Sequence, residues 1–319
     1  EWYKNKSEDL LYSVPVPAQT GVSNTSVTMN AASMENSGFE FSATYRNRDH
    51  ALKYDISANV STLKNKVTSL GIGKNSYITG AYATYVGQEI GKFYGWVYEG
   101  IARTQDELDG HATQQGANVG DCLYKDISGP NGEPDGVIDA YDQTVLGSGL
   151  PKVNFGLSTH MEYKGFDLNI STYGVLNYHV SDDIYNSLNS CYGYGNKEVG
   201  MLDANRWSED GSTYLSSVPR TYAANNATLG WNDLFSSRKI QNAAYWKIAN
   251  VELGYNFPDK WFGGYVSGVR LYVSAQNLYT FTGYHGYNVD YAGGTFTPGY
   301  NFCSFPSART FMCGLHFTF

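Results

Sequence analysis

The sequence is poor in charge and proline and has no long apolar segment. Only 16% of its 319 residues are charged and 9 are proline, whereas soluble domains average about 25% charged residues. No stretch approaches a run of about 18 apolar residues, which argues against a transmembrane helix. The net charge of −8 argues against a nucleic-acid partner, because phosphate binding needs a basic surface.

Catalytic and metal-binding motifs are missing as well. The 4 cysteines (Cys122, Cys191, Cys303 and Cys313) show no CxxC spacing, which argues against a zinc site. The 6 histidines form no HExxH motif, there is no GxSxG elbow, and the glycine-rich stretches do not lie in the context of a phosphate-binding loop. The sequence therefore predicts a protein that is not an enzyme.

The sequence also lacks a charged-then-apolar leader at its start. Glu1-Trp2-Tyr3-Lys4 reads as the interior of a structural element. We therefore expect the chain to be part of a longer protein.

Aromatic residues and two-residue alternation are abundant instead. There are 28 tyrosines, 15 phenylalanines and 6 tryptophans. Apolar and polar residues alternate in 245–257, in 269–281 and in the last residues, up to Phe319. We expect Tyr245, Ala249, Val251, Leu253, Tyr255 and Phe257 to share one face. These stretches predict half-buried strands of a length that can cross a membrane when tilted, about 9–11 residues.

Changes of parity along the chain predict tight hairpins. A turn at Lys164-Gly165 would pair Tyr163 with Phe166, because a two-residue turn makes its flanking residues direct partners. A turn centred on Arg48-Asp49 would likewise pair Tyr45 with Leu52.

The connections between the predicted strands alternate in length. The short connections are 46–51, 164–165 and 258–268, and the long ones are 63–151, 178–242 and 282–308. Short turns at one end and long loops at the other are typical of bacterial outer-membrane barrels. The sequence therefore predicts an all-β, antiparallel transmembrane β-barrel, whose last strand turns Leu315 and Phe317 to lipid and Met312, Gly314 and His316 to the lumen.

Several motifs in the chain resemble those of a known family. They are Asn36-Ser37-Gly38-Phe39-Glu40, Gly91-Lys92-Phe93-Tyr94-Gly95, Asp135-Gly136-Val137-Ile138-Asp139, the stretch 242–255 and the stretch 271–278. In this order they resemble the C-terminal barrel portion of a SusC-like TonB-dependent outer-membrane transporter. The resemblance assigns all of 1–319 to that portion and places the N-terminal plug and the upstream strands outside this chain.

The resemblance implies a function in uptake. Such transporters have barrels of about 22 strands and import oligosaccharides or peptides across the outer membrane. They are energised by TonB through their N-terminal region and capped by a SusD-like surface lipoprotein. Two alternatives stay open: a passive outer-membrane porin and a soluble β-sandwich carbohydrate-binding module.

An acidic stretch, 131–142, has the ligand spacing of a calcium loop. Oxygen ligands would come from Asn131, Glu133, Asp135, Val137, Asp139 and Asp142, with Gly136 at the sharp turn. Asp126 could replace Asn131, because the loop of the resembled family is shorter. We expect that a bound Ca²⁺ would brace the loop. The alternative is an acidic turn on a solvated loop.

Aromatic side chains in two of the long connections are candidates for substrate binding, because their faces can stack on sugar rings. These candidates are Tyr185, Tyr192, Tyr194, Trp207, Tyr214, Trp231, Tyr284 and Tyr287. The alternative is that they pack the loops together or against the lipoprotein, since aromatics are enriched in ordinary interfaces too.

Overall fold

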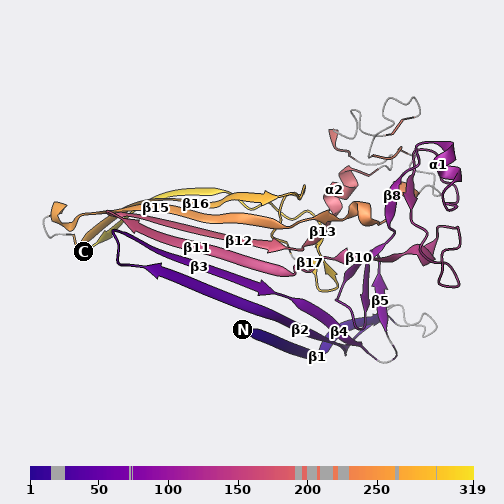
Figure 1. Ribbon diagram of the computed structural model, residues 1–319, viewed down its shortest axis with the longest axis horizontal. Coiled ribbons are helices and arrows are strands. Elements are labelled where there is room, and N and C mark those ends of the chain that lie inside the picture. Colours follow the sequence, from indigo (N-terminus) through magenta and orange to yellow (C-terminus); the bar gives the residue numbers. More distant parts are fainter. Residues whose placement is uncertain are drawn as a thin grey trace.

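The computed structural model describes residues 1–15, 26–71, 73, 75–190, 196–199, 207–208, 218–221, 230–262, 266–291 and 293–319. Its main element is a twisted antiparallel sheet (Figure 1). In spatial order, its strands are β1 (Trp2–Pro15), β2 (Ser26–Asn47), β3 (Leu52–Thr62), β11 (Val153–Tyr163), β12 (Phe166–Leu176), β15 (Tyr245–Phe257), β16 (Gly268–Thr282) and β20 (Thr310–Thr318). The short strand β4 (Lys64–Leu70) also pairs with β2.

The sheet is a meander, because each strand follows its spatial neighbour in the chain apart from the elements of the loops. Within the described residues β1 and β20 are its two edges and do not pair with each other. The sheet is therefore an open wall, and the predicted all-β antiparallel architecture is confirmed.

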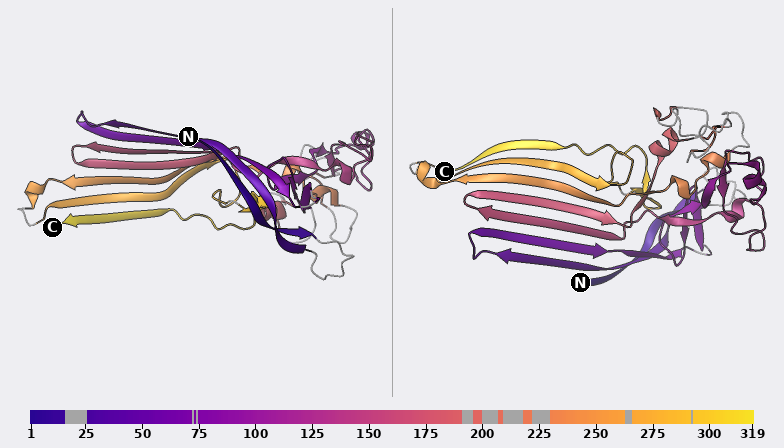
Figure 2. Two further views of the ribbon diagram at one scale, coloured as in Figure 1. Left: turned by 90° about the horizontal axis from the view of Figure 1, so that it is seen from below. Right: turned by 45° about the horizontal axis from the view of Figure 1, so that its top comes forward.

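Long and short connections lie at opposite ends of the strands (Figures 1 and 2). The three long connections form a layer beyond one end, next to the labelled α2, β8 and β10, while the C-terminus lies at the other end. The predicted asymmetry of the loops is therefore confirmed.

The loop layer consists of short elements. A four-stranded sheet runs β10 (Thr144–Ser148), β7 (Lys92–Gly95), β6 (Tyr82–Tyr85), β5 (Ser76–Thr79). Smaller ladders join β8 (Tyr98–Ile101) to β9 (Cys122–Tyr124), β13 (His179–Asp182) to β14 (Gln241–Asn242) and β19 (Tyr300–Asn301), and β17 (Gly293–Gly294) to β18 (Thr297–Pro298). The helical turns are α1 (Gln105–Asp109), α2 (Asp183–Leu188), η2 (Ala140–Asp142), η3 (Gly230–Asp233), η4 (Ser237–Lys239) and η5 (Asp259–Trp261). Among the described residues, no helix has the length and apolar character needed to cross a bilayer.

The two faces of the sheet differ in polarity. The face we call apolar carries Phe41, Tyr45, Leu253, Leu271, Val273, Leu315 and Phe317, each at least 41% exposed. The opposite face, the polar face, carries Asp55, His160, Asp167, Glu252 and Arg270. Uncovered apolar side chains in a continuous band match a wall that faces lipid. A soluble β-sandwich would instead cover this face with a second sheet.

Most of the buried apolar residues lie in the loop layer, whereas the apolar side chains of the sheet away from the loops are exposed. Phe93, Tyr124 and Ala243 are 0–1% exposed. One cluster joins the wall to the loops through Val175 and Tyr245 of the sheet and Tyr284 and Val289 of the β16–β20 loop. Burial therefore fixes the loops on the ends of the strands.

The hairpin predictions meet different outcomes. Tyr163 pairs with Phe166, and the turn residues Lys164 and Gly165 have positive φ, as a two-residue hairpin turn requires. Tyr45, however, pairs with Ile56 and not with Leu52. The predicted turn at Arg48-Asp49 is therefore wrong, and the loop is longer, with Arg48 reaching across it to the Asp55 carboxylate.

A β-bulge in β15 makes the predicted face of Tyr245 wrong. Asn250 pairs with Ser171, but Ile248 pairs with Thr172, so that Ala249 is an extra residue in β15. Tyr245 was expected to share a face with Val251, yet it lies on the other side of the sheet and is 8% exposed. The bulge shifts the alternation by one residue and turns Tyr245 and Lys247 to the polar face.

The final strand has the predicted register. Leu315 and Phe317 pair with Leu271 and Val269 on the apolar face. His316 pairs with Arg270 on the polar face. Met312 and Gly314 pair with Ser274 and Tyr272 on the same polar face.

Candidate ligand-binding surface

Charged side chains on the polar face form cross-strand networks near the short turns. Arg270 of β16 contacts the Asp167 carboxylate of β12 through Nη2 at 2.5 Å and Nε at 3.0 Å, and the Glu252 carboxylate of β15 at 2.7 Å. Asn256 adds a 3.0 Å bond to Asp167. Two-point contact between a guanidinium and a carboxylate fixes orientation as well as charge, so this network holds three strands in register.

His160 forms a second polar-face network. Its Nδ1 lies 2.7 Å from the Asn169 amide oxygen and its Nε2 lies 2.9 Å from Glu162. The polar face is therefore a hydrogen-bonded surface suited to contact with water or polar ligands.

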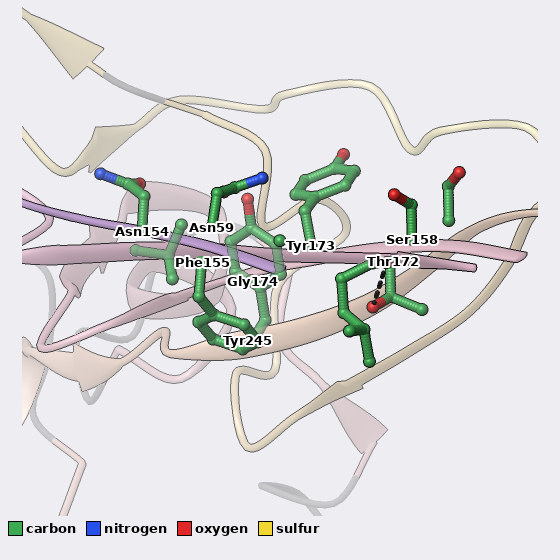
Figure 3. Close-up of a pocket in the computed structure, with 12 residues that line it drawn as sticks. Asn59, Asn154, Phe155, Ser158, Thr172, Tyr173, Gly174 and Tyr245 are labelled. Carbon is green, nitrogen blue, oxygen red and sulfur yellow. Dashed lines mark hydrogen bonds between the residues drawn. The ribbon is translucent and has the colours of Figure 1, made fainter. Parts of the chain in front are cut away.

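A hollow of about 460 Å³ lies nearer the loops (Figure 3). Asn59, Asn154, Tyr173 and Ser158 rise from one side of the strands, whereas Phe155 and Thr172 point to the other. The Asn59 amide packs against Gly156. A Cβ at position 156 would lie only 2.9 Å from Asn59 Nδ2, so a larger residue would displace this amide. The lining thus combines amides and hydroxyls with Tyr173, Tyr245 and Val175.

One ion pair ties the β16–β20 loop to this part of the sheet. Lys247 Nζ lies 2.5 Å from Asp290 Oδ2, and Lys247 is only 3% exposed. Tyr173 Oη also donates to Asp290, at 3.2 Å, and its ring lies 5.8 Å from the lysine nitrogen. A buried lysine needs such a partner because desolvation of an unpaired charge is costly.

A hydrogen-bonded cluster of Tyr284, Asp182 and Asn301, which we call the Tyr284 node, joins the β12–β15 loop to the β16–β20 loop. The Tyr284 hydroxyl donates to Asp182, and Asn301 Nδ2 donates to both Asp182 (3.2 Å) and the Tyr284 hydroxyl (2.7 Å). Asp182 also caps α2 by accepting from Tyr185 N at 2.8 Å. Burial, followed by the bond to Asp182, raises the pKa of Tyr284 well above its usual value, so the hydroxyl stays protonated as a donor.

The candidate aromatic residues fall into different environments. Tyr284 is held in the node above. Trp207 is 8% exposed and packs over Gly120, where a Cβ would meet its ring. Trp231 lies 6.2 Å from the Tyr124 ring and donates from Nε1 to the Gln115 carbonyl. These three side chains pack the loops, as the alternative interpretation expected.

Two of the candidate aromatics remain available on the loops. Tyr287 is 64% exposed, and Tyr185 stacks on His285 with ring centroids 5.6 Å apart. Tyr192, Tyr194 and Tyr214 lie outside the described residues. A role of these aromatics in substrate binding stays a prediction.

Tyr185 also lines a cavity of about 310 Å³ between four stretches of the loop layer. Its other lining residues are Tyr98, Asn186, Asn189, Val218, Asp233, Arg238 and Lys239. The sequence analysis missed Arg238 and Lys239, because the only local signal is a pair of adjacent basic residues in a long connection.

The carboxylates of the acidic loop bind backbone amides. Asp142 is fully buried and accepts from Ile127 N (2.7 Å) and Ser128 N (3.1 Å) with one oxygen, and from Asp139 N (2.8 Å) with the other. Asp126 accepts from Gly136 N at 2.7 Å. Such bonds stabilise a carboxylate-rich turn.

The remaining candidate calcium ligands point elsewhere. Asn131, Glu133 and Val137 are exposed, and the Asp135 carboxylate accepts from Val137 N. In the described part of the chain, no three acidic, histidine or cysteine side chains are grouped as a metal site requires. The Asp126 Oδ1 atom is buried without a hydrogen-bond partner, and bound Ca²⁺ stays a prediction.

Sequence reasoning also missed Lys247 and Asp290. Lys247 interrupts an apolar alternation, and the bulge that turns it to the polar face has no sequence signal in β15 itself. Asn277, across the ladder in β16, has a φ of +51° and marks the adjacent irregularity. Asparagine tolerates this conformation better than most residues, which explains why it is the exception in its own alternating strand.

Comparison with known proteins relates the whole chain to larger ones. No family model matches it. It is 31% identical over 338 residues to TonB-dependent receptor P3 of Formosa agariphila, covering 100% of this chain and 32% of that protein. It is 27% identical over 332 residues to TonB-dependent receptor SusC of Bacteroides thetaiotaomicron, covering 99% of this chain and 29% of SusC. The chain thus spans about a third of the length of these curated relatives, which are receptors and not enzymes.

Solved structures share the fold. The structure of the RagAB peptide transporter superposes with a TM-score of 0.77 at 22% identity, covering 98% of this chain and 32% of that one. The 'open-open' state of the RagAB peptide importer gives a TM-score of 0.76 over 100% of this chain. The open wall with its loop layer therefore corresponds to part of a larger transporter barrel.

Proposed function

We propose that this chain is the C-terminal barrel portion of a SusC-like TonB-dependent receptor and is part of an active importer of the bacterial outer membrane. The imported compounds are oligosaccharides or peptides. TonB supplies the energy through the N-terminal region of the complete receptor. The first support is similarity along the whole chain to receptors of this kind.

One observation carries the proposal: the wall has a continuous apolar face on one side and hydrogen-bonded charges on the other. Leu271 and Leu315 pair on the apolar face, while Arg270 and Asp167 lie on the polar face. Only closed barrels and helices satisfy every backbone polar group in lipid. A wall of this kind is therefore suited to enclosing a polar passage within a membrane.

A SusD-like surface lipoprotein is the proposed partner. The β16–β20 loop exposes Tyr287, Phe302 and Phe305, which are 64%, 63% and 88% exposed. Exposed aromatics on an otherwise packed loop are typical of protein interfaces. These side chains would contact the lipoprotein at the outer end of the barrel.

The test uses the complete receptor in its native membrane. Native mass spectrometry of outer membranes in mild detergent should find a receptor of roughly three times this chain's length, since the chain covers 32% of its relative, together with a lipoprotein. Uptake of the cognate nutrient should stop when TonB is deleted. Uptake that persists without TonB would favour the passive porin, and a soluble protein without a partner would contradict both.

A further inference from the structure

We propose that the cavity between α2, β8 and the η3–η4 segment binds the carboxylate group of an imported compound, and thus selects acidic substrates. This inference rests on the proposed import function. The cavity lies in the loop layer, where α2 and β8 are labelled in Figure 1. Acidic sugar units and acidic peptide residues share this chemistry.

Arg238 supplies the charge. It lines the cavity and is half-buried. Over the part of the chain that the structure describes, its guanidinium takes part in no hydrogen bond or ion pair. The guanidinium is always protonated, and its fork of donors matches the two oxygens of a carboxylate. A half-buried, unpaired arginine at a cavity is therefore a ready site for a carboxylate.

The other charges at the cavity do not neutralise Arg238. The Lys239 ammonium donates to the backbone carbonyl of Asp233. The Asp233 carboxylate accepts from Ser190 Oγ at 2.9 Å and forms no salt bridge with Arg238 among the described residues. Among the described residues, the lining thus has two positive side chains and one negative one, which gives them a net charge of +1.

The remaining lining suits the body of a small polar unit. Tyr98, Tyr185 and Val218 provide apolar surface. The Tyr185 ring is held in place by its stacking on His285 at an interplanar angle of 15°. Aromatic walls that are already ordered lose little entropy when a ligand binds.

Two amides provide acceptors. Asn186 Nδ2 donates to Ser181 Oγ at 3.2 Å, and Asn189 Nδ2 donates to the Tyr185 carbonyl at 2.9 Å and to Glu198 at 3.0 Å. With the amide nitrogens engaged inside the protein, the amide oxygens are the atoms left to accept from hydroxyl or N–H groups. A volume of about 310 Å³ is at the small end of ligand pockets, so the cavity fits one unit of an oligomer.

The test measures binding to the complete purified receptor in detergent, separately from transport. Titration calorimetry would use two matched pairs of probes: trigalacturonate and its methyl ester, and the peptides Ala-Glu-Ala and Ala-Gln-Ala, both N-acetylated and C-terminally amidated so that the glutamate side chain is the only carboxylate. At least one acidic probe should bind at least about 10-fold more tightly than its neutral counterpart, as expected when a charged hydrogen-bond partner is lost. The acid that binds identifies the source of the carboxylate.

Variants locate the binding to the cavity. Arg238→Gln should weaken binding of the acidic probe at least about 10-fold and remove the preference over the neutral probe, while Arg238→Lys should retain part of it. Arg309→Gln makes the same charge change at an exposed position away from the cavity and should leave binding unchanged.

Equal binding of acidic and neutral probes, no binding of any probe, or equal loss in Arg238→Gln and Arg309→Gln would overturn the inference. TonB-dependent uptake of a neutral nutrient would survive that result, so the two proposals fail separately.

Discussion

Lys247 on the wall and Asp290 in the β16–β20 loop meet at 2.5 Å, with the lysine side chain 4% and the aspartate side chain 25% exposed. This pair links the sheet to the loop through a nearly buried lysine. Breaking a buried pair by removing one partner costs about 3–5 kcal/mol. The partial exposure of Asp290 places the expected cost at the lower end, because solvent screens the pair.

We therefore predict that Lys247→Met loosens the β16–β20 loop. Limited proteolysis of the folded receptor should cleave this loop faster in the variant. Lys53→Met, an exposed position on the polar face, is the matched control and should show the parent rate. Unchanged cleavage in Lys247→Met would mean that the pair does not hold the loop.

The two faces of β20 should respond differently to charge. Leu315→Arg turns a charge to lipid and should destabilise the folded barrel by about 2–4 kcal/mol if it lies near the midplane. His316→Arg turns the charge to the polar face and should be tolerated. Denaturant titration of the refolded receptor in vesicles measures both, and equal costs would disprove the register.

Asp142→Ala should destabilise the acidic loop. Three part-buried backbone N–H groups lose their acceptor, and each loss should cost no more than that of a buried unsatisfied donor, about 1–3 kcal/mol. Hydrogen exchange of 125–142 should become faster in Asp142→Ala, whereas Glu133→Ala, at an exposed position, should exchange like the parent.

The same exchange measurement tests the calcium prediction. If Ca²⁺ braces the loop, protection of 125–142 should rise when calcium is added after chelation, and Asp126→Asn should abolish that rise. Identical exchange with calcium and with chelator would leave the backbone hydrogen bonds as the whole explanation of the loop.

The Tyr284 node should weaken in alkali. Burial raises the pKa of Tyr284, so the folded state keeps the proton that the unfolded state loses near pH 10. The contribution of this residue to stability is therefore complete below about pH 10 and falls as pH rises further. Tyr284→Phe should lower stability at pH 7 and flatten the alkaline decrease. An unchanged pH profile would argue against this role.

Periodicity predicted the elements of this fold better than their irregularities. The strand 245–257 and the Tyr163–Phe166 hairpin have the predicted limits, because two-residue alternation and its change of parity mark strands and tight turns directly. The turn after Tyr45 could not be placed, since a longer loop of even length preserves the same parity. Several loop contacts, such as Tyr284 with Asp182, join residues 102 positions apart, and no local pattern signals them.

The candidate site was predictable only as a region. Aromatic richness of the long connections located it, but the pattern cannot distinguish Trp231, which packs a loop, from Tyr185, which lines a cavity. Arg238 matters because nothing pairs with it among the described residues, and the absence of a partner is visible only in three dimensions.

The bulge at Ala249 has a consequence for the whole wall. Between Asn250 and Phe257, the even-numbered residues of β15 lie on the polar face. Between Tyr245 and Ile248, the odd-numbered residues do. A cysteine-labelling scan of β15 should therefore change from even to odd positions at Ala249. The regular part of the strand and the part that holds the loop can therefore vary independently. A one-residue difference in length at 249 would be absorbed without moving any side chain to the wrong side of the membrane wall.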